Sequence, residues 1–470
     1  MLGMPAWMLA GVVGSALVVA LVVAMTITRK FSLLVGMGGL LFFSAMALPV
    51  EWNDEGVRRT FWLGVQSNRD YFYGLFGILT LGLLVFQLPR LVGKRKSLVS
   101  MTLVVIGLFM AMLRFIHEGV SDGILSLGLA SIALPAMLLA PAAVIDDEDD
   151  VHPLLRTILF ANAVWFGMCM VQFVVDRSLI VFGNSNRFVG LLSNPQHAGT
   201  FLACVTTTSL FMALNEPKKL WRFAAIGMLA ADGLLLLWTG SRTSLGMAVV
   251  GSAGVLLTRM GRAVLMLPIV AAFFALALKV LGSGFSEAST TLDRLGGGED
   301  TRSAAWARMI GKAIENPLIG AGTSNAGSSE NAWLYGFASY GIGMFALSLL
   351  LTLFAGIQLI KAFRSRWGLP KEQQTAIDLS AGLVLAFFAG AVFEGFFSAR
   401  ISPNLVFVMV FSGVLARLLQ LSEQRLDDRV AYADVHDEFG DYGEEAEQPE
   451  HDGSEQPGWD ADGAQPAALW

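Results

Sequence analysis

Charged residues are scarce in this sequence. Asp, Glu, Lys and Arg make up 15% of the 470 residues, whereas hydrophobic residues make up 54%. A soluble globular chain carries about 25% charged residues, so the deficit indicates segments that never meet water. Runs such as 8–24, 31–48 and 344–360 approach the roughly 20 apolar residues that cross a bilayer. These runs lack the alternating pattern of outer-membrane strands, so the sequence predicts an all-α polytopic membrane protein.

The sequence also has few cysteines, and its first apolar run lacks the usual features of a signal peptide. Cys169 and Cys204 both fall inside apolar runs, so they form no disulfide framework and are expected to be small packing residues. The first apolar run follows no Lys or Arg and shows no clear cleavage site, which favours a retained first helix over a signal peptide.

The apolar segments predict about 12–13 transmembrane helices, one long extracytoplasmic loop and a tail. The candidate spans are roughly 7–28, 31–48, 71–88, 98–116, 123–144, 155–175, 197–214, 220–239, 243–258, 263–281, 331–360, 376–397 and 402–420. We divide the chain into N-terminal membrane helices (1–150), a second membrane region (151–420) that includes the loop 282–330, and a tail (421–470).

The positions of Lys and Arg predict the orientation. Alternate loops carry basic clusters near residues 29–30, 90–96, 218–222, 259–262 and 361–371. One alternation places all of them in the cytoplasm, with the N-terminus outside. The opposite face then holds an unusual set of arginines, which suggests a task there: Arg177, Arg187, Arg242, Arg294, Arg302, Arg308 and Arg400.

The acidic net charge of −6 comes from the tail. Residues 421–470 hold fifteen acidic and two basic residues, a net charge of −13, while the other 420 residues hold 30 basic and 23 acidic residues, a net charge of +7. The tail is poor in apolar residues, so we expect it to be disordered and cytoplasmic. Nothing in this balance suggests binding to nucleic acid.

The long loop predicts a short amphipathic helix that serves as a lid or wall. Trp306, Met309, Ile310, Ala313 and Ile314 recur at helical spacing on one side. Asp300 or Thr301 can cap this helix and Pro317 stops it. Gly320 and Gly322 then permit a tight turn before the next span.

Metal and cofactor chemistry are not expected. The run DDEDD at 146–150 contains an Asp-x-Asp pattern, but the predicted orientation places it in the cytoplasm, away from the arginines, where it is expected to be a solvated loop. No His/Cys cluster has ligand spacing, and no Gly-rich phosphate loop follows a strand.

Three segments of the predicted outer face resemble one known family. They are GNSNRFVGLLSNPQHAG at 183–199, TGSRTSLG at 239–246, and the stretch 302–343 with Arg302, Trp306, Asn316-Pro317, Gly320, Gly322, Glu330-Asn331 and Gly341. In order and topology they resemble the bacterial O-antigen ligase and polysaccharide polymerase superfamily, over about residues 155–360. Ligases of that family commonly carry His where Glu330 stands, so the resemblance favours a polymerase.

The resemblance implies a glycosyltransferase of the bacterial inner membrane, active at its outer face. Its partners would be an undecaprenyl-pyrophosphate-linked oligosaccharide donor, a glycan acceptor, membrane lipid and other polysaccharide assembly proteins. Arg187 and Arg242 are candidates for binding the pyrophosphate, because guanidinium groups bind phosphate bidentately. Arg302 is a weaker third, and Asn194, Asn331 and His197 are further substrate-binding candidates. Glu330 is the candidate base, with His197 as its rival.

Structural roles remain open for the same residues. Arg187 and Arg242 could be interfacial anchors, Glu330 could cap the following helix, and Arg302 could pair with Glu299. Asp232 and Glu394 lie within apolar spans, with Arg400 or Arg242 as candidate partners. A transporter or flippase for lipid-linked saccharides is the alternative function, and a non-catalytic assembly protein is a third. Transporters often contain internal repeats and helices broken near the midplane, and we find no convincing repeat.

Overall fold

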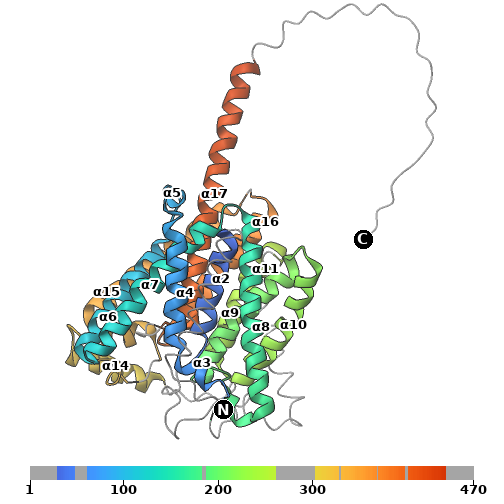
Figure 1. Cartoon of the computed structure of the whole chain (residues 1–470). Helices are drawn as coiled ribbons and strands as arrows, with labels where there is room; N and C mark the ends of the chain where they lie inside the picture. Colours follow the sequence, from blue (N-terminus) through green and yellow to red (C-terminus); the bar gives the residue numbers. More distant parts are fainter. Residues whose placement is uncertain are drawn as a thin grey trace, which may run out of the picture. The chain divides into compact units, whose positions relative to one another are not determined.

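The computed structural model describes residues 29–47, 61–182, 187–260, 302–327, 330–367, 369–396 and 401–440. Residues 1–422 form one compact unit and residues 423–470 a second. The first unit is a helical bundle (Figure 1). Nine of the helices in these ranges are long and apolar enough to cross a membrane, as expected for a multi-pass membrane protein.

The elements follow the sequence in a nearly all-helical order. Helices α2 to α8 are Arg29–Ser44, Leu63–Ser67, Arg69–Val85, Leu88–Leu91, Leu98–His117, Val120–Val144 and Val151–Val175. Helices α9, α10, α11, α14, α15, α16 and α17 are Pro195–Asn215, Lys219–Thr239, Arg242–Met260, Arg302–Glu315, Ala332–Ser365, Lys371–Ala391 and Pro403–Gly440. Short 3-10 turns are η2 (Glu148–Asp150) and η3 (Arg177–Ile180). Two-residue strands, β1 (Val181–Phe182) and β2 (Arg187–Phe188), pair antiparallel.

Eleven of the thirteen predicted spans coincide with described helices, and the spans 7–28 and 263–281 lie outside the described residues. The two largest differences lie at the ends of α16 and α17. The span predicted to reach residue 397 ends as helix α16 at Ala391. The tail predicted to be disordered from Ser422 continues as helix α17 to Gly440, because extending an existing helix needs no new nucleation. Residues 441–470 lie outside the described part.

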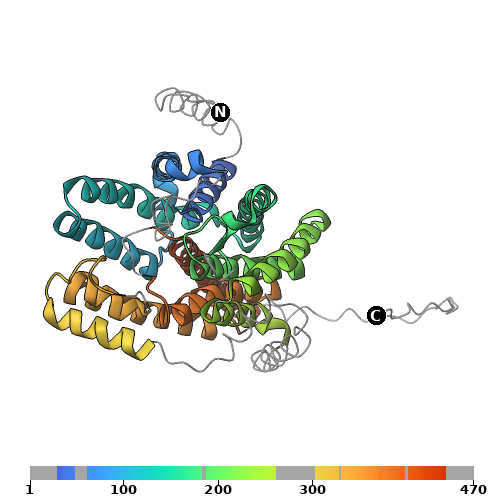
Figure 2. The same cartoon turned by 90° about the horizontal axis from the view of Figure 1, so that it is seen from below.

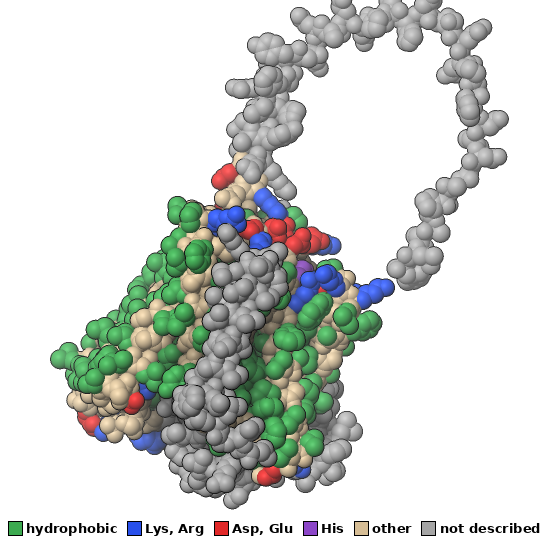
Figure 3. All heavy atoms as spheres, in the orientation of Figure 1, with side chains coloured by type: hydrophobic (Ala, Val, Ile, Leu, Met, Phe, Trp, Pro, Cys, Tyr) green, Lys and Arg blue, Asp and Glu red, His purple; other side chains and the backbone are tan. Residues whose placement is uncertain are grey.

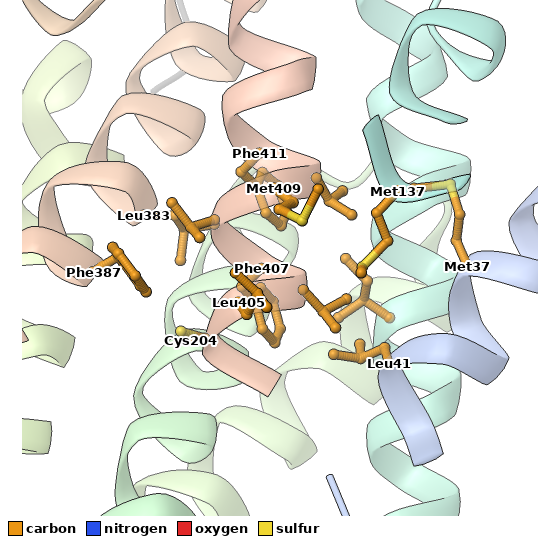
Figure 4. Close-up of a cluster of buried hydrophobic side chains, with 14 of the residues drawn as sticks. Met37, Leu41, Met137, Cys204, Leu383, Phe387, Leu405, Phe407, Met409 and Phe411 are labelled. Carbon is orange, nitrogen blue, oxygen red and sulfur yellow. The ribbon is translucent and has the colours of Figure 1, made fainter. Parts of the chain in front are cut away.

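The core of the first unit surrounds the membrane-spanning part of α17, which is buried along most of its length and lies among the other helices when viewed along the bundle (Figure 2). Leu405, Phe407 and Met409 of this helix pack beside Leu383, Leu41 and Met137 of three other helices (Figure 4). Cys204 lies in the same cluster, and it and Cys169 are buried free thiols, as predicted for packing residues.

Glycine permits a close contact between helices α11 and α16. A Cβ added to Gly254 would lie 2.6 Å from Cα of Gly382, and one added to Gly390 would lie 2.4 Å from Sδ of Met247. Small residues let helix backbones approach closely within a membrane. Because the two helices run antiparallel, this contact brings the beginning of α11 next to the end of α16.

The two ends of the bundle differ in their charged groups. At the end that we call the basic end, Lys30 Nζ lies 2.8 Å from Asp150 Oδ2 and Lys94 Nζ lies 2.5 Å from Asp146 Oδ1. Arg156 binds the fully buried Glu216 at the same end. Hydrophobic side chains cover the flank between the ends on the face shown in Figure 3. The basic clusters at 90–96 and 218–222 thus belong to loops of one end, as the predicted alternation requires.

The run DDEDD belongs to the basic end. The pKa of Asp146 is lowered: burial acts to raise it, but hydrogen bonds from Lys94 and Lys30 outweigh the burial. Asp147 caps the turn η2 by accepting a hydrogen bond from the Asp150 backbone. Among the residues described, no three His, Cys, Asp or Glu side chains group closely enough to hold a metal ion.

Candidate functional site

The opposite end of the bundle, which we call the loop end, contains the turn between α10 and α11. Helix α10 ends at Thr239, and Gly240 adopts the left-handed conformation (φ 59°) that closes the helix. Ser241 and Ser244 are joined by a hydroxyl–hydroxyl hydrogen bond of 2.7 Å. Residues 239–244 therefore form a compact, hydrogen-bonded turn at which α11 begins with Arg242.

The first two motif segments meet at this turn. Arg187, on β2, donates a hydrogen bond from Nε to the carbonyl oxygen of Thr239 at 2.6 Å. The segment after the Asn194-Pro195 turn reaches it too, because a Cβ added to Gly199 would lie 2.5 Å from Ser244 Oγ. Arg187 and Arg242 are thus brought to one turn although they are 55 positions apart in the sequence.

The third motif segment reaches the same turn through α14. Arg302 Nη2 donates to Thr243 Oγ1 at 3.3 Å, and its guanidinium lies 4.6 Å from the ring centre of Phe393. This ring contact is a cation–π arrangement. Arg302 therefore joins α14, α11 and the segment that follows α16.

Helix α14 lies within the residues predicted to form an amphipathic helix and packs on α15, but its apolar face is narrower than expected. Met309 and Ala313 are buried against α15, whereas Ile310 and Ile314 are 46% and 71% exposed. Trp306 donates from Nε1 to the carbonyl oxygen of Glu330 at 3.3 Å. The predicted caps Asp300 and Thr301, together with Glu299, lie outside the described residues.

Helix α15 is broken close to its beginning. Gly341 has φ 78°, and Gly320 and Gly322 in the preceding loop also have positive φ, as the predicted turn requires. The Ile342 N–H donates to Pro317 O at 2.8 Å, and the Ala321 N–H donates to Ala338 O at 2.8 Å. The loop backbone therefore satisfies groups of the helix at the break.

Asn331, rather than Glu330, caps the first part of α15. Its side-chain oxygen accepts a hydrogen bond from the Leu334 N–H at 3.0 Å, and its Nδ2 donates to Val392 O at 3.0 Å. The capping role considered for Glu330 is therefore performed by its neighbour. Through its bond to Val392, Asn331 also holds the end of the loop against the segment that contains Glu394.

Glu394 is the residue that sequence reasoning left without a role. It lies just beyond α16 and is 5% exposed. Burial raises its pKa to about 7, opposed by a hydrogen bond from Thr243 and by the charge of Arg302. The negative charge of Glu330 raises the pKa further, and Arg187 lowers it. The predicted partner Arg242 was wrong; Thr243, the next residue, is the partner. Arg400 lies outside the described residues.

The arginines and carboxylates form what we call the Arg–Glu cluster: Arg187, Arg242, Arg302, Glu330 and Glu394. Arg242 is exposed at its rim. Glu330 Oε2 and Glu394 Oε1 are both buried and accept no hydrogen bond from the described residues. Buried carboxylate oxygens are normally paired, so this pair is suited to a ligand that donates hydrogen bonds.

Two predicted substrate-binding residues lie elsewhere. Asn194 caps α9 by accepting a hydrogen bond from the His197 N–H at 2.8 Å. The exposed His197 ring lies 3.2 Å from Ser193 Oγ and lines a separate cavity at the loop end. Asp232, the other acid in an apolar span, accepts a hydrogen bond from Asn162 at 2.8 Å and not from Arg242, one of its two candidate partners.

No protein-family model matches this chain, and no curated protein matches it significantly.

Proposed function

We propose that this protein is a membrane glycosyltransferase that polymerises or ligates glycan units carried on undecaprenyl pyrophosphate. The observation that carries the proposal is the Arg–Glu cluster, where motif segments far apart in sequence converge on the turn 239–244. The loop end then faces the outside of the bacterial inner membrane. This orientation follows from the gathering of the basic loops at the other end.

The arginines supply what a pyrophosphate leaving group needs. A guanidinium keeps its charge in a poorly hydrated site and binds phosphate oxygens in a planar fork. Arg187, Arg242 and Arg302 carry three positive charges, against at most two negative charges on Glu330 and Glu394. The cluster therefore favours a polyanion, and neutral Glu394 strengthens that preference.

The proposed transfer reaction is a displacement at the anomeric carbon of the donor sugar. The acceptor hydroxyl oxygen forms a bond to this carbon, and the bond between the carbon and the pyrophosphate oxygen breaks. The electron pair leaves with undecaprenyl pyrophosphate, where arginine stabilises the developing charge. Glu330 accepts the hydroxyl proton. Glu394 holds Thr243 and titrates beside Glu330, so that it sets the charge of the site.

The broken helix α15 is the feature that would favour a transporter, since transporter sites use helices interrupted near the midplane. The break at Gly341 leaves residues 342–365 as helix. At 1.5 Å per residue these span about 36 Å, enough for a hydrocarbon core of about 30 Å. The break therefore lies at one end of the span, where it supports the loop rather than a midplane site.

Reconstitution separates the two functions. The purified protein in liposomes, supplied with undecaprenyl-pyrophosphate-linked glycan in both leaflets, should produce longer lipid-linked chains and free undecaprenyl pyrophosphate. Chain extension without any movement of donor between leaflets supports the enzyme. Movement of the donor without extension would overturn the proposal in favour of a flippase.

A further inference from the structure

Two adjoining cavities of about 240 and 270 Å³ lie at the loop end beside the Arg–Glu cluster. Both are lined by Ser44, Arg69, Arg114, Glu118 and Ile401, so they share one wall. Together they reach the size range of small-molecule sites, about 300–1,000 Å³. We call the pair the side cavity.

Charges in the side cavity compensate one another. Arg69 Nε donates to Asp70 Oδ1 at 2.9 Å, and Arg114 Nε donates to Glu118 Oε2 at 2.6 Å. Asp122 adds a further carboxylate to the lining. The described lining thus holds two arginines and three carboxylates, unlike the Arg–Glu cluster with its excess of arginine. A multiply charged anion is therefore disfavoured here.

The remaining lining consists mostly of aliphatic and aromatic side chains, with a few hydroxyl and amide groups among them. Thr323 donates to Glu118 Oε1 at 2.9 Å, so the loop 316–327 closes one side. Asn404 is 3% exposed and its Oδ1 is buried without a hydrogen-bond partner among the described residues. Tyr73 and Phe396 add aromatic surface. A few placed polar groups on apolar and aromatic walls can orient an uncharged, hydroxyl-rich molecule.

The side cavity ends next to the Arg–Glu cluster. Its wall includes Gly395 and Phe396, which directly follow Glu394 in the chain. His197 lines the same cavity, and Gly199, two positions later, packs on the turn 239–244. A molecule bound here can therefore present a hydroxyl group toward the carboxylates while the arginines bind the donor.

We infer that the side cavity binds uncharged sugar residues of the acceptor glycan. The inference rests on the proposed function. In the side cavity, the paired guanidinium and carboxylate groups form hydrogen bonds with sugar hydroxyl groups. Asn404 Oδ1 accepts one further hydrogen bond. His197 then contacts the acceptor rather than acting as the base.

The test blocks the cavity without touching the Arg–Glu cluster. Ser193→Trp places an indole in the cavity from its rim, and Glu118→Gln weakens the polar lining. Ser178→Trp is the matched control, because Ser178 is exposed at the same end and does not line the cavity. The probe is the neutral oligosaccharide fraction released from the host polymer by mild acid, with inorganic pyrophosphate as competitor.

Titration calorimetry of the detergent-purified proteins should show equal probe affinity for wild type and Ser178→Trp. Ser193→Trp and Glu118→Gln should weaken it at least tenfold. In the transfer assay both should raise the acceptor KM at least tenfold and change the donor KM less than twofold. Ser193→Trp carries the test if Glu118→Gln fails to fold.

Each result bears on the inference separately from the proposed function. If the probe binds in a cavity-dependent way but the protein has no transfer activity, the inferred sugar site is supported and the proposed enzyme function is rejected. Normal transfer and an unchanged acceptor KM in Ser193→Trp would overturn the cavity and leave the enzyme standing. Displacement of the probe by inorganic pyrophosphate in the Arg187→Ala protein would also overturn the inference, because it would identify the cavity as a phosphate site.

Discussion

The Arg187 side chain donates a hydrogen bond from Nε to the carbonyl oxygen of Thr239 at 2.6 Å. Thr239 is the last residue of α10, where helix carbonyls lack intrahelical partners and attract a cation. The bond therefore fixes the guanidinium beside the turn that begins α11.

Replacing Arg187 or Arg242 by Ala should lower the transfer rate at least about 100-fold, because each removes a preorganised charge from the leaving group. Lys should restore little activity, since it keeps the charge and loses the planar fork. The control is Arg308→Ala, on the exposed face of α14, which should stay within twofold. Rates are measured on purified proteins, after confirming that the variants insert into the membrane as well as the wild type does. Normal rates in both alanine variants would contradict the enzyme assignment.

The variants Glu330→Gln and Glu394→Gln should distinguish the catalytic roles of the two carboxylates. Removing the base at Glu330 should lower kcat about 10²–10⁴-fold at all pH values. Glu394→Gln should retain measurable activity and lose the ionisation near pH 7 from the pH–rate profile, because burial raises the pKa of Glu394 to about 7. If the Glu330→Gln variant is active and the Glu394→Gln variant is inactive, the roles of the two carboxylates are reversed.

Stability should fall as the pH rises from about 4.5 to about 7. The pKa of Glu394 is about 7 in the folded protein against an ordinary 4.5, so folding favours the protonated carboxyl. Its contribution is complete below the unfolded pKa and is lost as the pH rises through the folded pKa, about 3 kcal/mol in total. Glu394→Gln should therefore raise the Tm in detergent at pH 8. Glu315→Gln, at an exposed site, should leave it unchanged. A lower Tm for Glu394→Gln at pH 8 would refute this.

Gly341→Ala should destabilise the loop end by about 2–4 kcal/mol, because the residue has φ 78° and a Cβ would lie 2.2 Å from Leu318 O. Gly356→Ala lies in the same helix with open space around it and should be neutral or slightly stabilising. Thermal unfolding of the two variants provides the comparison. Equal Tm values would mean that position 341 does not require glycine.

Ser324→Cys and Lys218→Cys should react with impermeant maleimide from opposite sides of the membrane. Both positions are exposed, the first at the loop end and the second at the basic end. The native Cys169 and Cys204 are buried and should give little background. We expect Ser324→Cys to be labelled in intact cells whose outer membrane is permeabilised, and Lys218→Cys only after lysis. Labelling of both in intact cells would contradict the orientation.

The sequence by itself determined the helices and their alternation. Apolar runs that avoid water can be placed from composition alone, and basic loops gather at one end because charge is costly to move across a bilayer. It also pointed to Arg187, Arg242, Arg302 and Glu330 by resemblance, although their function remains a proposal. The length of α17 escaped it because helix propagation continues past the apolar residues.

Only the tertiary structure decided which polar groups meet. The carboxyl of Glu394 lies against Thr243 because glycine lets α11 and α16 approach closely, a contact that joins residues 151 positions apart. Asn331 became the helix cap because its short side chain reaches the Leu334 N–H. The side cavity combines Arg69 and Arg114 with residues beyond 190, and neither arginine stands out in the sequence, since each lies at the end of an apolar run. Such long-range contacts depend on side-chain packing, which local pattern does not encode.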